Sequence, residues 1–266
     1  MTVNSHLENL SSSLVLKGDE KDSISTSIAT ISTRLSSYFG SNIKERFQFG
    51  SSTRGTILPR RADEGSDIDY LVVFDTSSET YKPQTYLDKL RKFAEHYYST
   101  SISRQSHPTI AIELNHIRFE LVPSIKPDLW SSYQIPSPSD SFMQWMDTDP
   151  TGFSQRLTDK NSSNAYRIKP LIRLVKYWNA LNGRHFSSYD LENYIVSVNY
   201  PFFYSATLKD YFYAFWNMFS YGSGTPQYVA DKVNRAKENV AAIAQHEQDG
   251  YPSLAEGTLQ KMLPSI

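Results

Sequence analysis

The run Ile68–Phe74 limits how this chain can fold more than any other feature of its sequence. Apart from Asp69, its residues are β-branched, aromatic or aliphatic. A short apolar run of this composition is typical of a central strand that is buried on both faces of a sheet. The run therefore predicts a β-sheet around which the other elements are arranged.

Composition sets the outer limits of the fold and the function. With 266 residues, of which 39% are hydrophobic and 14% aromatic, the chain can bury a large core, as one domain or as two small ones that share it. A net charge of -1 argues against general nucleic-acid binding, and the lack of cysteine excludes disulfides. Neither a signal segment nor an apolar run of about 20 residues is present, so we expect a cytoplasmic protein without a membrane partner.

The remaining elements divide the chain into a mixed half and a helical half. Strands are predicted at Ile43–Phe49 and as a pair, Thr109–Leu114 and Ile117–Val122, that turns at Asn115-His116 and ends at Pro123. A proline-containing loop then runs to Pro138. The predicted helices are Ile24–Phe39, which Gly40 and Asn42 end, Tyr86–Tyr98, Ser141–Asp147, Arg167–Leu181, Ser188–Val198, Leu208–Phe219, Gln227–Gln245 and Leu254–Met262. We expect domains at residues 1–135 and 136–266.

Three carboxylates in the mixed half suggest chemistry. Asp67 and Asp69 project from one face of a strand, about 7 Å apart, and Glu120 lies on another apolar strand. Carboxylate oxygens are ligands that divalent cations prefer. Taken alone, an Asp-x-Asp is more often a solvated turn, a strand Glu more often faces outward, and Gly50-Ser51 is an ordinary turn. Their joint occurrence at the ends of predicted strands favours a metal site.

Basic residues gather in the helical half. Between residues 156 and 184 the only acid is Asp159, whereas the bases are Arg156, Lys160, Arg167, Lys169, Arg173, Lys176 and Arg184. The i, i+4, i+7 spacing puts Lys169, Arg173 and Lys176 on one helix face, opposite an apolar face that contains Trp178. This pattern predicts that one face packs and the other presents three cations. Alone it indicates a solvated face; beside a metal site we prefer a triphosphate cradle.

The segments Phe49–Thr56 and Ser66–Phe74 together resemble the polymerase-β-like nucleotidyltransferase superfamily. Within it the chain is similar to the branch that contains oligoadenylate synthetase, cyclic GMP-AMP synthase and the bacterial cyclic-oligonucleotide synthases (CD-NTases). The resemblance implies an α+β fold, in which a nucleotidyltransferase core with a mixed sheet is joined to a helical C-terminal region that closes the nucleotide cleft.

The resemblance also implies roles for individual residues. Asp67 and Asp69 match the ligands of two Mg2+ ions, for which Mn2+ can substitute, and Glu120 falls where a third carboxylate, usually Asp, is expected. Gly50 and Ser51 match the turn that contacts the β,γ-phosphates. The helix around Ile172–Trp178 gives the phosphate-binding role to Lys176, with Arg173 as second choice. Ser188 matches a Ser that reaches the triphosphate, and it is also a candidate helix cap. Tyr189 matches a ring that stacks on the base. We interpret Glu192 as structural.

The function that follows is synthesis of a cyclic di- or trinucleotide messenger from nucleoside triphosphates, in bacterial antiphage signalling, with a downstream effector that responds to the product. Two alternatives stay open. The chain could be a nucleotidyltransferase that acts on RNA ends or another small acceptor, although an extended basic surface is not evident. It could also be a non-catalytic nucleotide-binding module, against which the intact Asp67 and Asp69 pair argues.

Overall fold

The computed structural model describes residues 2–101, 103–106, 108–128, 132–137, 144–200 and 205–266. Its contacts group the chain into two compact units. The sheet unit comprises Leu16–Arg60 and Gly65–Gln155, and the helical unit comprises Met1–Val15, Arg61–Glu64 and Arg156–Ile266. The domains expected at residues 1–135 and 136–266 stay a prediction.

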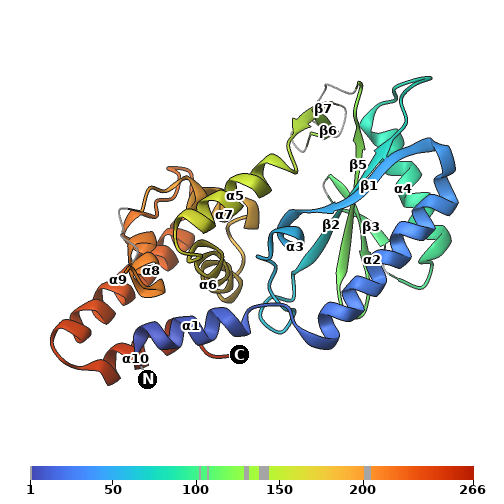
Figure 1. Ribbon diagram of the computed structural model, residues 1–266. Helices are drawn as coiled ribbons and strands as arrows, with labels where there is room; N and C mark the ends of the chain where they lie inside the picture. Colours follow the sequence, from blue (N-terminus) through green and yellow to red (C-terminus); the bar gives the residue numbers. More distant parts are fainter. Residues whose placement is uncertain (1, 102, 107, 129–131, 138–143, 201–204) are drawn as a thin grey trace. The chain divides into compact units, whose positions relative to one another are not determined.

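The sheet unit is built on a mixed sheet (Figure 1). The strands run in the order β1-β2-β5-β4-β3, and β6 and β7 extend the sheet from β5. Strands β2 and β5 are parallel, whereas the other neighbouring pairs are antiparallel. The bounds are β1 Ile43–Phe49, β2 Asp67–Phe74, β3 Ser103–Ser106, β4 Thr109–Glu113, β5 Arg118–Ile125, β6 Tyr133–Pro136 and β7 Trp145–Thr148. Central β2 confirms the strand predicted from its apolar run.

Helices α2 (Gly18–Phe39) and α4 (Pro83–Tyr97) cover one face of this sheet (Figure 1). Their apolar stripes join a buried core with every second residue of β2, including Ile68 and Tyr70. Gly40 ends α2 at φ +53°, as predicted, because glycine adopts this left-handed region without a Cβ clash. The short helix α3 (Gly50–Arg54) joins β1 to the loop before β2.

Two predictions about the end of this unit are wrong. Pro123 does not end the second strand of the pair, because β5 continues to Ile125. Its neighbour β4 pairs only as far as Leu121, so a missing N–H at Pro123 removes no bond to β4. The helix predicted over Ser141–Asp147 is contradicted from Trp145 on, where β7 pairs with β6; residues 141–143 lie outside the described ones.

The helical unit is formed by α1 (Val3–Ser13), α6 (Ile168–Leu181), α7 (Ser188–Ser197), α8 (Leu208–Met218), α9 (Gln227–Gln248) and α10 (Pro252–Met262). Helix α5 (Gly152–Ser163), which the sequence did not predict, leads the chain into it. A mixed sheet followed by a helical C-terminal region confirms the predicted α+β class. Among the described residues, no helix combines the length and apolarity that crossing a membrane requires.

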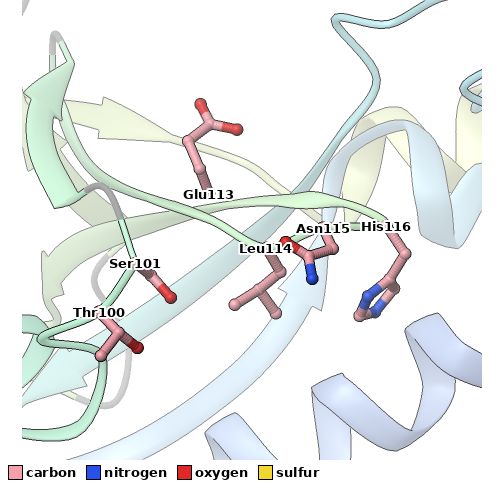
Figure 2. A pocket seen from close by; sticks show the side chains of 6 residues that line it. All are labelled: Thr100, Ser101, Glu113, Leu114, Asn115 and His116. Carbon is pink, nitrogen blue, oxygen red and sulfur yellow. The ribbon is translucent and has the colours of Figure 1, made fainter.

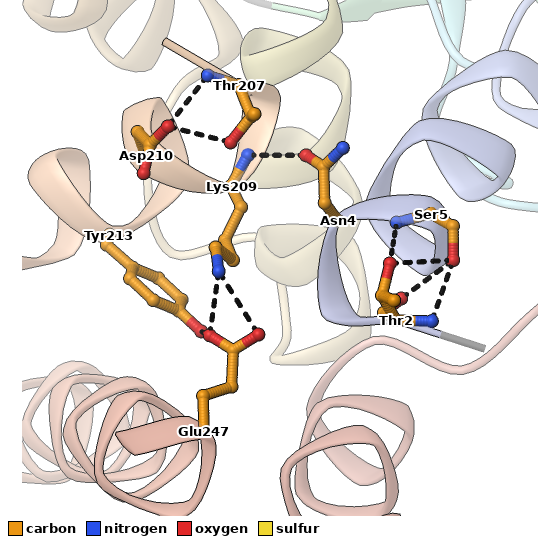
Figure 3. A network of polar contacts seen from close by, with 8 residues as sticks. All are labelled: Thr2, Asn4, Ser5, Thr207, Lys209, Asp210, Tyr213 and Glu247. Atoms are coloured by element: carbon orange, nitrogen blue, oxygen red, sulfur yellow. Dashed lines mark hydrogen bonds and ion pairs between the residues drawn. The ribbon is translucent and has the colours of Figure 1, made fainter. Parts of the chain in front are cut away.

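Polar contacts hold α1 against the last helices of the chain (Figure 3). A capping box between Thr2 and Ser5 begins α1. The Asn4 Oδ1 atom accepts a hydrogen bond of 3.1 Å from the backbone N–H of Lys209 in α8, whose Nζ lies 2.9 Å from Glu247 Oε2 in α9. Buried His6 contacts the backbone oxygen of Leu263 at 3.0 Å. The first helix is thus an integral part of the helical unit.

Candidate active site

Asp67 and Asp69 lie where strand alternation predicts them. Both are partly exposed at the start of β2, whereas Ile68 and Tyr70 between and beyond them are buried in the core. The two carboxylates therefore share the sheet face that α2 and α4 do not cover. This face turns apolar further along β2, where Leu71 and Val73 form a small buried cluster.

Gly50 makes room for Asp69. It begins α3 at φ +75°, and a Cβ at this position would lie 1.9 Å from Asp69 Oδ2. Any side chain here would have to displace the carboxylate, so the glycine is required both by its conformation and by this close approach. Ser51 follows it and is 8% exposed, with its backbone oxygen accepting hydrogen bonds from the N–H groups of Thr56 and Ile57. The structure thus brings the predicted Gly-Ser turn against the predicted carboxylates.

Glu120 lies beside Asp69 but is held by other side chains. The two residues are direct partners of the parallel strands β2 and β5, so their side chains project from the same face. Arg118 Nη2 lies 2.6 Å from Glu120 Oε1, and the Thr109 hydroxyl donates a hydrogen bond of 3.2 Å to Oε2. Neither Arg118 nor Thr109 was predicted as a site residue. The two-residue spacing of Arg118 and Glu120 on one strand was a signal that could have indicated Arg118.

These carboxylates fit a divalent metal as a pair rather than as a trio. Asp67 and Asp69 offer hard oxygen ligands from one strand face. Within the described ranges, no three His, Cys, Asp or Glu side chains gather closely enough to hold a metal ion. The contacts of both Glu120 oxygens with Arg118 and Thr109 are consistent with this. A three-carboxylate site would require Glu120 to turn toward the aspartates.

The cations of α6 differ from the prediction. Leu171, Leu174 and Trp178 pack as expected, but Arg173 and Lys176 are only 9% and 5% exposed, so the expected face of three presented cations is wrong. Arg173 Nε donates a hydrogen bond of 3.0 Å to the backbone oxygen of Ser11 in α1, and burial lowers the pKa of this guanidinium to about 10. Since every residue from Leu171 to Asn179 is buried, α6 is the central helix of its unit rather than an amphipathic surface helix.

Lys176 pairs with Glu192 from α7. Its Nζ lies 3.4 Å from Glu192 Oε1, and Glu192 is fully buried. A buried charge of this kind is tolerated because an opposite charge and hydrogen bonds compensate for the lost hydration. The structural interpretation of Glu192 agrees with this placement, which also fixes the position of the Lys176 ammonium.

Other bases of the predicted basic segment also have acidic partners within the helical unit. Arg167 lies 3.6 Å from Glu8, and Arg184 lies 2.5 Å from Asp63. Burial lowers the pKa of Lys160, whose ammonium lies 5.8 Å from the centre of the Tyr200 ring. The local excess of basic residues in the sequence is therefore reduced in the fold by acids from distant segments.

The start of α7 presents the remaining predicted residues. Ser187, not Ser188, caps the helix, because its hydroxyl accepts a hydrogen bond of 3.0 Å from the Asp190 N–H. Ser188 is the first helical residue and is exposed, and the Tyr189 ring is 51% exposed. Both side chains are thus accessible, unlike those of Arg173 and Lys176.

A cavity of about 650 Å³ lies at the turn between β4 and β5 (Figure 2). Its lining includes Thr100, Ser101, Leu114 and His116. Glu113 also lines it, but Figure 2 shows its carboxylate pointing to the side of the strand opposite Leu114. Strand register pairs Glu113 with Arg118, so the two side chains share a face. None of the predicted site residues lines this cavity.

Comparisons with known proteins show the family to which the chain belongs. A family model described as "Second Messenger Oligonucleotide or Dinucleotide Synthetase domain" (SMODS) matches residues 1–161. A probable cyclic nucleotide synthase from Bacillus cereus (strain VD146) is 28% identical over an alignment of 189 residues, and the match covers 58% of this chain and 55% of that protein. The match thus spans little more than half the length of this curated relative.

Solved structures match nearly the whole chain. The CdnC protein of E. coli MS115-1, solved with ATP, covers 98% of both chains at a TM-score of 0.71 and 14% identity. The CD-NTase CdnG of Bradyrhizobium diazoefficiens, solved in complex with GTP, gives a TM-score of 0.73 at 10% identity, covering 97% of this chain and 98% of that one. At such low identities these likenesses establish the fold.

Proposed function

Because the chain belongs to the Second Messenger Oligonucleotide or Dinucleotide Synthetase family, we propose that it is a metal-dependent nucleotidyltransferase that makes a cyclic di- or trinucleotide from nucleoside triphosphates. The observation that carries the proposal is the Asp67 and Asp69 pair on one sheet face, with Gly50 packed directly against Asp69. We further propose that the product acts in antiphage signalling through a downstream effector.

In this proposal the carboxylates bind two Mg2+ ions, for which Mn2+ can substitute. Asp67 and Asp69 are the principal ligands, and Glu120 would become the third by turning toward them. Bound divalent ions supply charge neutralisation for the attacking and leaving oxygens of an in-line displacement. Asp69 and Glu120 are the two candidate bases that would accept the proton of the attacking ribose hydroxyl. The new bond joins that hydroxyl oxygen to the α-phosphorus, and the bond from the α-phosphorus to the pyrophosphate oxygen breaks.

Substrate contacts are proposed for residues of each unit, and the geometry that bears on each contact is that of the unit that contains it. Gly50 and Ser51 are proposed to contact the β,γ-phosphates. Lys176 is proposed to bind the triphosphate because of the family resemblance, and this contact would require its buried ammonium to turn away from Glu192. Arg173 is the second choice, with its Nε already bonded to Ser11.

The exposed start of α7 is proposed to complete the nucleotide contacts. The Ser188 hydroxyl would reach the triphosphate, and the Tyr189 ring would stack on the base. Such stacking accepts any base, because each base has a π-face. The proposal therefore leaves the base composition of the product open.

The test is product analysis with all four nucleoside triphosphates. The purified protein is incubated with Mg2+ or Mn2+, pyrophosphate release is followed, and the products are treated with phosphatase and analysed by mass spectrometry. A phosphatase-resistant species with the mass of two or three cyclised nucleotide monophosphates is expected, and a parallel reaction with EDTA should contain none. Long tails, or transfer only to an added RNA, would replace the proposal by an RNA-end nucleotidyltransferase.

A further inference from the structure

An arginine lies within the carboxylate face of the sheet. Strand register places Asp67 opposite Arg118, and Arg118 opposite Glu113, in one row across β2, β5 and β4. The next row contains Asp69 and Glu120. Directly paired residues of neighbouring strands project from the same face. The Arg118 side chain therefore projects from the same face as the carboxylates to which metal binding is assigned.

The contacts of Arg118 are close and partly shielded from water. Its Nη2 lies 2.6 Å from Glu120 Oε1, and its Nε lies 3.6 Å from Glu113 Oε1. The side chains of Arg118 and Glu120 are 21% and 17% exposed. Partial burial strengthens the attraction between opposite charges relative to bulk water. The Thr109 hydroxyl donates a hydrogen bond to the second Glu120 oxygen, so both oxygens of this carboxylate have a partner.

We propose that Arg118 is a positioning residue that acts as the internal counter-ion of this face and competes with a divalent cation for Glu120. The proposal rests on the proposed metal role of Asp67 and Asp69. A cation that reaches the two aspartates meets a positive charge beside the third carboxylate, so its affinity in the absence of nucleotide is low. A bound triphosphate adds negative charge, which offsets that of Arg118 and lets the metal recruit Glu120.

This arrangement makes metal loading depend on the substrate. The Arg118 guanidinium places a positive charge beside two carboxylates of this face before any ligand arrives. Removing that charge should tighten metal binding while it releases Glu120 from its orientation. Tighter metal binding together with slower turnover is a combination that loss of a merely structural contact would not produce.

The experiment measures Mn2+ affinity by electron paramagnetic resonance, with and without a non-hydrolysable triphosphate, and turnover by pyrophosphate release. Without nucleotide, Arg118→Met should bind Mn2+ about fivefold more tightly than the wild-type protein, and its kcat should fall at least about tenfold. Arg118→Lys keeps the charge, so its Mn2+ affinity should stay near that of the wild type. Arg91→Met is the matched control, because Arg91 forms a 3.0 Å pair with Asp88 on α4; neither quantity should change.

Unchanged or weaker Mn2+ binding by folded Arg118→Met would overturn the inference. If that variant fails to fold, Arg118→Gln, which removes the charge and retains a donor, must show the same tightening. Asp69→Asn separates this inference from the proposed function on which it rests. Normal Mn2+ binding by Asp69→Asn would refute the metal site itself, whereas its loss beside an unchanged affinity in Arg118→Met would refute only the role of Arg118.

Discussion

The carboxylate face of the sheet and helix α6 both carry charges that the sequence assigns to one active site, yet the fold treats them differently. Asp67 and Asp69 remain partly exposed on a single strand face. Arg173 and Lys176 are almost fully buried, and each contacts a partner from another helix. Residues at i and i+2 of a strand always share a face, whereas a helix can be buried around its whole circumference. Side-chain spacing thus predicts which residues share a face, whereas their exposure depends on what packs against that face.

The largest effect should come from the strand side of this comparison. Asp67→Asn and Asp69→Asn should each lower pyrophosphate release about a thousandfold or more, because an amide keeps the shape but loses the charge that binds the metal. Thermal melting should stay near that of the wild type, since both side chains are partly exposed. Asp88→Asn, in the exposed pair on α4, is the control that should keep full turnover. Near-normal turnover in either variant would remove the metal assignment.

Substitution of Lys176 on α6 should lower the stability of the protein as well as its affinity for the substrate. Lys176→Met leaves Glu192 buried without its counter-charge, so the free energy of unfolding should fall by ~3–5 kcal/mol. Titration calorimetry with a non-hydrolysable triphosphate should show at least about tenfold weaker binding. The double variant Lys176→Met with Glu192→Gln should be more stable than the single one.

A more exposed ion pair serves as the matched control for stability. Lys209 and Glu247 are 27% and 25% exposed, so Lys209→Met should lose only ~1 kcal/mol when the unfolding free energies of both variants are measured by urea titration. If Lys176→Met lost no more stability than this control, the buried pair would contribute no more than an exposed one, and the contrast with the strand carboxylates would disappear.

The smallest effect should be that of Tyr189→Ala. Because the ring is 51% exposed, unfolding free energy should change by less than ~0.5 kcal/mol. Loss of a stacked base should raise the KM for nucleotide about tenfold, and Tyr189→Phe should restore it. Tyr228→Ala, at a ring that is 58% exposed on α9, controls for removal of a surface aromatic. An equal KM in the two alanine variants would exclude Tyr189 as a base platform.

The sheet was the most predictable part of the molecule. The strands at Ile43–Phe49 and Ile68–Phe74 and the hairpin at Asn115-His116 were predicted, because β-branched runs between turn residues carry a strong local signal. The face on which Asp67 and Asp69 lie follows from alternation alone. The proximity of Glu120 to Asp69 depends on strand register, which local sequence does not encode; the resemblance to a known superfamily supplied it.

What the sequence missed depends on contacts between distant segments. Helix α1 is rich in serine, which obscures the spacing of Val3, Leu7, Leu10 and Leu14, all buried. The partners of Arg173 and Lys176 come from α1 and α7, so no local pattern could show that these cations are buried. Trp145 lies in a strand rather than a helix, where its ring packs on Tyr86 at 5.6 Å between centroids.

Because α1 belongs to the helical unit and α2 to the sheet unit, the chain passes between the units at residues 15/16, 60/61, 64/65 and 155/156. Neither unit is therefore a contiguous cassette that recombination could exchange between relatives in one step. A gene fragment for residues 156–266 would lack α1. It would therefore lack the Ser11 oxygen that accepts a hydrogen bond from Arg173 and the His6 ring that contacts Leu263. A fragment for residues 1–155 would carry α1 without the helices that cover its apolar side. Exchange of one whole unit between two homologues would thus require several crossovers at once. We therefore expect the parts of the gene that encode the two units to be inherited together.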